Sequence, residues 1–241
     1  MIDLLHESNL AQVWCGPVEE WIGLSDEWAD LLVTDPPYGV SWRSGFRKNF
    51  SEMEGDDGTY DPIPVIGGVV ERRLKRFGHV YVFGRDLTPH ADDLRLGGVT
   101  ELVWDKKIIG PGNLSSPWGP QHEKVWFGVH VPSRSNRGRG DGRLSARLRQ
   151  GSVIRVPRRN SRQVSRHPTE KPVQLLRILI ESSSHLGDVV LDPYAGSGST
   201  GVAAIIEGRR TILVEIDRKY AELAVERMKE AEEWVSRVEK L

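Results

Sequence analysis

The chain has 241 residues, with 33 lysines and arginines against 34 aspartates and glutamates, which gives a formal net charge of −1. This length suits the core of one α/β domain, and the near-neutral charge excludes a protein held on nucleic acid by overall charge alone. The single Cys15 excludes an internal disulfide framework, the seven histidines lack zinc-ligand spacing, and no signal peptide or membrane span is visible, so we expect a cytoplasmic protein without a metal.

Apolar and alternating runs predict strands and helices that alternate along the chain. In the first half, strands are expected at residues 11–15, 31–34, 79–83, 100–104 and 124–128, and helices at 18–24 and 65–77. In the last part, strands at 189–191 and 211–214 alternate with helices at 173–182, 199–207 and 219–241. The alternation predicts an α/β fold with a mostly parallel, mixed sheet and helices on both faces.

A first motif, Asp35-Pro36-Pro37-Tyr38, directly follows the apolar strand 31–34. Ligands of open α/β sheets bind beyond the carboxyl ends of the strands, so these residues are candidates for a site. Consecutive prolines stiffen the backbone there, and Tyr38 offers a flat aromatic face. A Pro-Pro turn that only ends a strand is the structural alternative.

A second motif begins after strand 189–191 and continues into a helix. It reads Asp192-Pro193-Tyr194-Ala195-Gly196-Ser197-Gly198-Ser199-Thr200. Small residues before a helix let the backbone approach a ligand at the helix N-terminus. Strand 211–214 then leads to Glu215, with Asp217 two residues later, and an acid there can accept hydrogen bonds from ribose hydroxyls. An NAD-type site is the alternative, but Asp192 would repel a pyrophosphate and can pair with the ammonium of S-adenosylmethionine.

Together the two motifs resemble those of the amino-group DNA methyltransferases, and the order, with the catalytic motif first, resembles their permuted beta class. The resemblance implies a Rossmann-like, S-adenosylmethionine-dependent fold with circularly permuted motif order. It implies methyl transfer to the exocyclic amino group of a flipped base in double-stranded DNA, with Asp35, Pro36, Pro37 and Tyr38 as catalytic residues. An Asp at the first catalytic position favours adenine N6, and cytosine N4 or an RNA substrate is the alternative.

The resemblance also implies which residues hold the cofactor. These are Cys15, then Thr169, Lys171 and Pro172 in the His-Pro-Thr-Glu-Lys-Pro segment, the whole second motif from 192 to 200, and Glu215 with Asp217. A plain helix start with Thr169 as its cap is the structural alternative for the His-Pro-Thr-Glu-Lys-Pro segment.

Between residues 128 and 166 the chain is rich in arginine and has one acid, Asp141. The eleven arginines are at positions 134, 137, 139, 143, 147, 149, 155, 158, 159, 162 and 166. Their density suits contacts with phosphates and guanine edges, and a solvated basic loop is the alternative. The resemblance places target recognition in this region, so Arg155, Arg158, Arg159 and Arg162 are predicted to bind DNA.

We therefore predict one methyltransferase domain over residues 1–241, with a catalytic half at 1–127, an arginine-rich insert at 128–166 and a cofactor-binding half at 167–241. A methyltransferase acting on protein amides and a non-catalytic nucleic-acid-binding protein with the same fold are further alternatives. Besides double-stranded DNA, a second copy of the chain and a cognate restriction endonuclease are open as partners.

Overall fold

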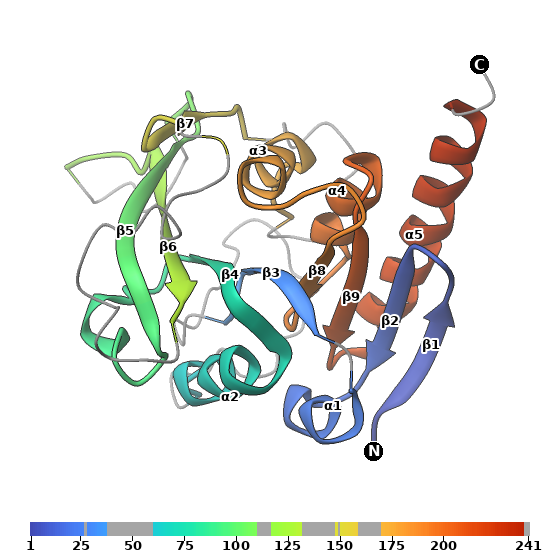
Figure 1. The fold of residues 1–241 in the computed structure, drawn as a ribbon. Coiled ribbons are helices and arrows are strands. Elements are labelled where there is room, and N and C mark those ends of the chain that lie inside the picture. The colour runs from blue at the N-terminus through green and yellow to red at the C-terminus, as the bar shows by residue number, and fades with distance from the viewer. Residues whose placement is uncertain are drawn as a thin grey trace.

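The computed structural model describes residues 1–26, 28–37, 60–109, 117–131, 148, 150–158 and 170–238. These residues form a nine-stranded sheet in the order β1-β2-β9-β8-β3-β4-β6-β5-β7 (Figure 1). The strands are β1 (Asp3–Glu7), β2 (Ala11–Cys15), β3 (Ala29–Thr34), β4 (Leu74–Phe83), β5 (Leu96–Asp105), β6 (His122–His130), β7 (Val153–Arg155), β8 (Val189–Asp192) and β9 (Arg210–Glu215). The five central strands β2, β9, β8, β3 and β4 run parallel, whereas β1 and β6 each pair antiparallel with their neighbours.

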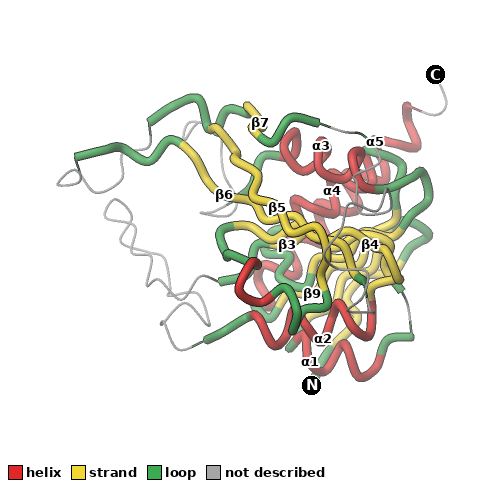
Figure 2. Tube along the Cα trace, turned by 60° about the vertical axis from the view of Figure 1, so that its left-hand side comes forward, coloured by secondary structure: helices red, strands yellow, loops and turns green. Residues whose placement is uncertain are grey.

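Helices cover both faces of this sheet, as Figure 2 shows. On one face lie α1 (Val18–Leu24) and α2 (Ile63–Arg73), and on the other lie α3 (Val173–Ser183), α4 (Ser199–Ile206) and α5 (Arg218–Val238); the 3₁₀ helix η1 (Thr88–His90) follows β4. Neighbouring residues of β3 alternate between the two cores, because Leu32 packs with the α1 and α2 cluster and Leu31 with the α3 and α4 cluster. None of the helices in the described residues combines the length and the apolar composition that crossing a bilayer requires.

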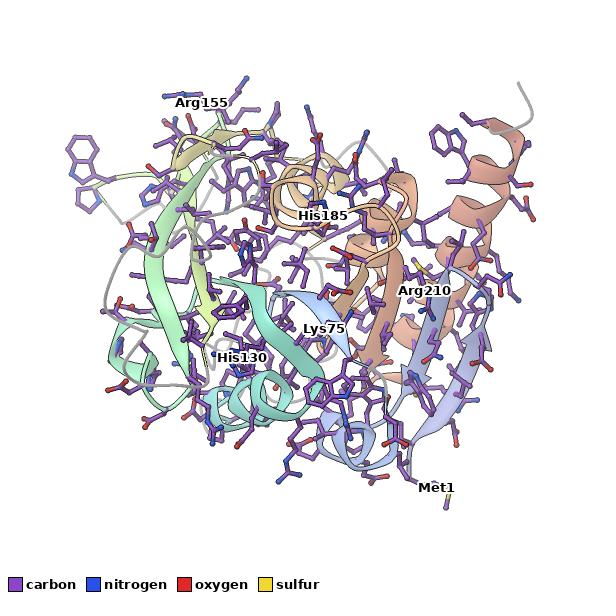
Figure 3. All side chains as sticks on the ribbon, in the orientation of Figure 1. Met1, Lys75, His130, Arg155, His185 and Arg210 are labelled. Carbon is purple, nitrogen blue, oxygen red and sulfur yellow. The ribbon has the colours of Figure 1, made fainter. Side chains whose placement is uncertain are left out.

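The helix expected at 65–77 is the main error in the predicted elements. Helix α2 ends at Arg73, and β4 begins at the next residue, where Leu74 pairs with Ala29 of β3. Lys75, which Figure 3 labels, then forms a 2.6 Å ion pair with Asp30 of β3. The backbone of these residues is therefore paired with a neighbouring strand, a long-range interaction that local apolar spacing cannot report. Strand 11–15 and helix 18–24 agree with β2 and α1 residue for residue.

Candidate active site

The two predicted motifs lie side by side at the carboxyl edge of the sheet. Strands β3 and β8 are parallel neighbours, with Leu31 opposite Val190. Where these strands end, the Thr34 hydroxyl donates a 2.9 Å hydrogen bond to Oδ1 of Asp192. Asp35 is the next residue after β3, so the structure brings the Asp-Pro-Pro segment and the glycine-rich motif to one place.

The carboxylate of Asp35 is paired with a largely buried lysine. Nζ of Lys171 lies 2.6 Å from Oδ2 of Asp35 and 2.9 Å from Oε1 of Glu123 on β6. The same ammonium lies 5.0 Å from the centre of the Phe83 ring. Burial alone would lower the pKa of Lys171, but the two carboxylates outweigh it and raise that pKa, so the ammonium stays charged.

Asp192 is buried, and its carboxylate accepts hydrogen bonds from neighbouring residues. Besides the Thr34 hydroxyl, the Thr200 hydroxyl donates to its Oδ2 at 2.7 Å, and the backbone N–H of Tyr194 donates to its Oδ1 at 3.1 Å. Burial raises the pKa of Asp192 to about 6, although these hydrogen bonds oppose the shift. Asp192 thus ties β3, β8 and the first turn of α4 together, and a direct contact with a cofactor ammonium stays a prediction.

The turn between Asp192 and α4 needs a glycine because of its backbone conformation and its packing against α5. Gly198 has φ +77°, and a Cβ atom at this position would lie 3.0 Å from Cβ of Ala224 on α5. The N–H of Ala195 donates to Val214 O on β9 at 3.0 Å, and the N–H of Gly198 donates to Ala195 O at 2.8 Å. A side chain at position 198 would be strained in both conformation and packing, so the sequence demands glycine there.

Glu215 closes the site at the end of β9. The backbone N–H of Gly196 donates to its Oε2 at 2.6 Å, and the N–H of Asp217 donates to its Oε1 at 2.9 Å. Burial raises the pKa of Glu215 to about 7 despite these two donors. Cys15, opposite Glu215 on β2, is buried, whereas the Asp217 side chain accepts a 2.8 Å bond from Lys219 N at the start of α5.

Several residues that the sequence did not single out complete the site. Glu170 forms a 2.8 Å ion pair with Arg227 of α5, and Nη1 of Arg227 also donates to the Ser197 carbonyl at 2.8 Å. The hydroxyls of Tyr60 and Tyr194 share a 2.6 Å hydrogen bond. One feature of the sequence could have identified Arg227. It lies within the apolar stripe of α5, one residue before the buried Met228.

Other predicted residues lie at the far edge of the sheet or outside the described residues. Tyr38, Thr169, Arg159 and Arg162 fall outside the described part of the chain. Three predicted prolines are buried. They are Pro36, Pro193 and Pro172, the last of which directly precedes α3. Arg155 ends β7, which pairs with β5 at the sheet edge (Figure 3).

This arrangement defines a Rossmann-like cofactor-binding fold, with a glycine-rich turn before a helix and an acid at the end of the next strand. Solved structures with the same fold include M1.HpyAVI in complex with S-adenosylmethionine, with a TM-score of 0.68, 19% identity and coverage of 91% of this chain and 99% of that one. The cytosine-N4-specific PvuII DNA methyltransferase has a TM-score of 0.64 and 16% identity, covering 98% of this chain and 96% of that one.

Sequence comparison identifies the family. The DNA methylase family matches residues 97–226. The DNA adenine methyltransferase YhdJ of Escherichia coli is 43% identical over 255 residues, covering 93% of this chain and 82% of YhdJ. The type II methyltransferase M2.MboI of Moraxella bovis is 32% identical, covering 85% of this chain and 82% of that protein. The chain belongs to the DNA methylase family, and the Rossmann-like methyltransferase fold expected from its motifs is confirmed.

Proposed function

We propose that this protein transfers the methyl group of S-adenosylmethionine to the N6 amino group of adenine in double-stranded DNA. The observation that carries the proposal is the meeting of the Asp35 segment with the glycine-rich turn at one edge of the sheet, joined by the Thr34–Asp192 hydrogen bond. The family, and the relative YhdJ, which is named a DNA adenine methyltransferase, support the same reaction.

The residues at the turn fit a positively charged nucleoside cofactor. Glu215 is a largely buried carboxylate that gains from hydroxyl donors, as a ribose would supply. Asp192 lies in the same turn, and two carboxylates there oppose a phosphate but favour a cation. When bound, S-adenosylmethionine supplies an activated methyl group. Cys15, Thr169, Pro172, residues 192–200 and Asp217 stay predicted cofactor contacts. Lys171 was predicted as one too, but its ammonium is paired with Asp35 and Glu123.

Asp35 has the chemistry that an amino group requires. The exocyclic nitrogen of adenine is a weak nucleophile, because its lone pair is delocalised into the ring. A fixed carboxylate that accepts a hydrogen bond from this amino group favours localisation of the lone pair towards the methyl group. The methylated nitrogen then loses a proton, to Asp35 or to water. Stacking of the flipped base on Tyr38 stays a prediction.

The sheet edge formed by β5 and β7 is the proposed DNA-contacting surface. Arg155 has 66% of its side chain exposed, and Arg158 is exposed nearby, where its N–H donates to Lys106 O at 3.3 Å. Among the residues that follow β5, Ile109 is exposed, and Trp118 is 85% exposed. Exposed guanidinium groups suit phosphate contacts, and an exposed indole can stack on a base. A second copy of the chain and a cognate endonuclease stay predictions from the resemblance.

The test is incubation of the protein with unmethylated duplex DNA and isotope-labelled S-adenosylmethionine, followed by nucleoside mass spectrometry. We expect labelled N6-methyladenine, and Asp35→Asn should abolish it while cofactor binding is kept. The matched control is Asp30→Asn, because Asp30 lies at the other end of β3 and pairs with Lys75 at 2.6 Å. Labelled N4-methylcytosine, or label in RNA alone, would contradict the proposed substrate.

A further inference from the structure

Four side chains of alternating charge form a continuous line that begins at Asp35. Nζ of Lys171 lies between Oδ2 of Asp35 at 2.6 Å and Oε1 of Glu123 at 2.9 Å. The second carboxylate oxygen of Glu123 lies 3.0 Å from Nζ of Lys106, near the end of β5. The line therefore connects the residue after β3, the residues before α3, strand β6 and the residue after β5.

Stability alone does not account for this line of charges. Replacement of a buried ion pair by apolar side chains is often neutral or stabilising, because removing charges from water is costly. Lys171 is nevertheless only 11% exposed, and its ammonium lies over the Phe83 ring. An ordered cation beside Asp35 does have a chemical use, since a hydrogen-bond acceptor for an amino group must be ionised and fixed in direction.

We propose that Lys171 is a positioning residue for Asp35: it keeps the Asp35 carboxylate ionised and oriented towards the target amino group, and Glu123 holds Lys171 in place. The inference rests on the proposed function, in which Asp35 accepts a hydrogen bond from the base. It assigns to Lys171 a role in methyl transfer that is separate from cofactor affinity.

The charges around Asp35 explain why a cation is needed there. Asp192, at the end of β8, repels the Asp35 carboxylate electrostatically, and Glu123 adds a second negative charge. Lys171 faces Asp35 directly, and Lys106 acts through Glu123. Burial opposes ionisation of Glu123, but the two lysines outweigh it and lower the pKa of that carboxyl, so the line stays charged.

The experiment measures single-turnover methylation of duplex DNA at saturating S-adenosylmethionine from pH 5 to 9, together with cofactor affinity by calorimetry. Lys171→Met should slow transfer by about 10²-fold, as expected when a reacting group loses its orientation. Loss of the cation should move the acidic limb of the rate profile up by about 1–3 pH units. Cofactor affinity should be unchanged, and Lys171→Arg should restore part of the rate.

Two further variants separate this role from a general effect on folding. Glu123→Gln keeps the Lys171–Asp35 pair but removes a negative charge that repels the Asp35 carboxylate, so it should move the acidic limb slightly down, opposite to Lys171→Met. Lys124→Met is the matched control, because Lys124 is the next residue on β6 and its 2.8 Å pair with Glu101 is exposed. This control should leave the rate and the pH profile unchanged. If Lys171→Met does not fold, the acidic limb of Glu123→Gln decides the question.

The outcomes distinguish this inference from the proposed function. If Lys171→Met weakens cofactor binding but keeps the wild-type rate and profile at saturation, Lys171 is a cofactor ligand and the inference is wrong. The same holds if Asp35→Asn is inactive while Glu123→Gln keeps the wild-type rate and the wild-type acidic limb. A wild-type protein that methylates no DNA would instead overturn the proposed function, and the inference with it.

Discussion

Arg227 on α5 and Glu170, two residues before the Pro172 that precedes α3, form a 2.8 Å ion pair in which Glu170 is only 3% exposed. The same guanidinium donates to the carbonyl and the hydroxyl of Ser197, at 2.8 and 2.9 Å. The Arg227 side chain thus links α5 to both Glu170 and the glycine-rich turn. The shape of the predicted cofactor site therefore depends on a residue outside both motifs.

Arg227→Met should destabilise the protein and weaken cofactor binding. The variant removes a cation from a buried carboxylate, a change that costs about 3–5 kcal/mol for buried ion pairs. The control is Arg237→Met on the same helix, whose pair with Glu233 is exposed and 3.7 Å long and should contribute about 0–1 kcal/mol. Urea unfolding and calorimetric titration with S-adenosylmethionine measure both effects. Equal stability of the two variants would contradict the proposed support of the turn.

Gly198→Ala should be more harmful than an alanine at another glycine with the same backbone conformation. Gly187 has φ +83° with no atom within 4 Å of the added Cβ, whereas the Cβ at Gly198 would lie 3.0 Å from Ala224. Gly187→Ala therefore measures the conformational cost alone, about 1–2 kcal/mol. Gly198→Ala should lower the free energy of unfolding further, because its Cβ would also displace α5. It should also weaken cofactor binding. Similar unfolding midpoints and similar affinities would show that the contact with α5 is unimportant.

The pH dependence of cofactor binding should reflect Glu215. Its pKa is raised to about 7 from an ordinary value of 4.5, so the folded free protein binds more protons than the unfolded chain between these values. Stability from this group is therefore present below about pH 4.5 and is lost as the pH rises to about 7. Ribose hydroxyls donate more strongly to the ionised carboxylate, so cofactor affinity should increase from pH 6 to 8.

Glu215→Gln provides the test of this dependence. The amide does not titrate, so the variant should bind S-adenosylmethionine more weakly at pH 8, and its affinity should vary less with pH. Titrations in buffers of different ionisation enthalpy should show proton release on binding to the wild-type protein near pH 7 and less release for the variant. An unchanged pH dependence in Glu215→Gln would assign the effect to another group, with Asp192 as the next candidate.

The salt dependence of DNA binding should locate the contact surface. Each phosphate contact contributes about 0.9 to the slope of log K against log salt concentration. Replacing Arg155 and Arg158 together by Gln should therefore reduce the slope by about 1.8 if both contact phosphates. The control is Arg72→Gln, an exposed arginine on α2. A slope equal to that of the wild type would exclude the β5–β7 edge from the DNA interface.

The sequence predicted the sheet, both motifs and their meeting point, because buried parallel strands and a glycine-rich turn leave strong local patterns. The Asp35–Lys171–Glu123 contacts could not be predicted, since they join three segments through tertiary packing alone. The end of α2 at Arg73 was missed for the same reason, because the pairing of Leu74 with Ala29 is long-range. Strand β7 was not predicted either. It has only three residues, within an arginine-rich region, and is too short to show the alternation of apolar and polar residues that indicates a strand.

The strand order also has a consequence for synthesis of the protein. Strands β8 and β9 lie in the middle of the sheet, between β2 and β3, yet they come last in the chain. Until they emerge from the ribosome, the edges of β2 and β3 that they will cover have no strand to pair with. Open strand edges of this kind are prone to aggregation, so completion of this sheet is a late step that chaperones are expected to protect.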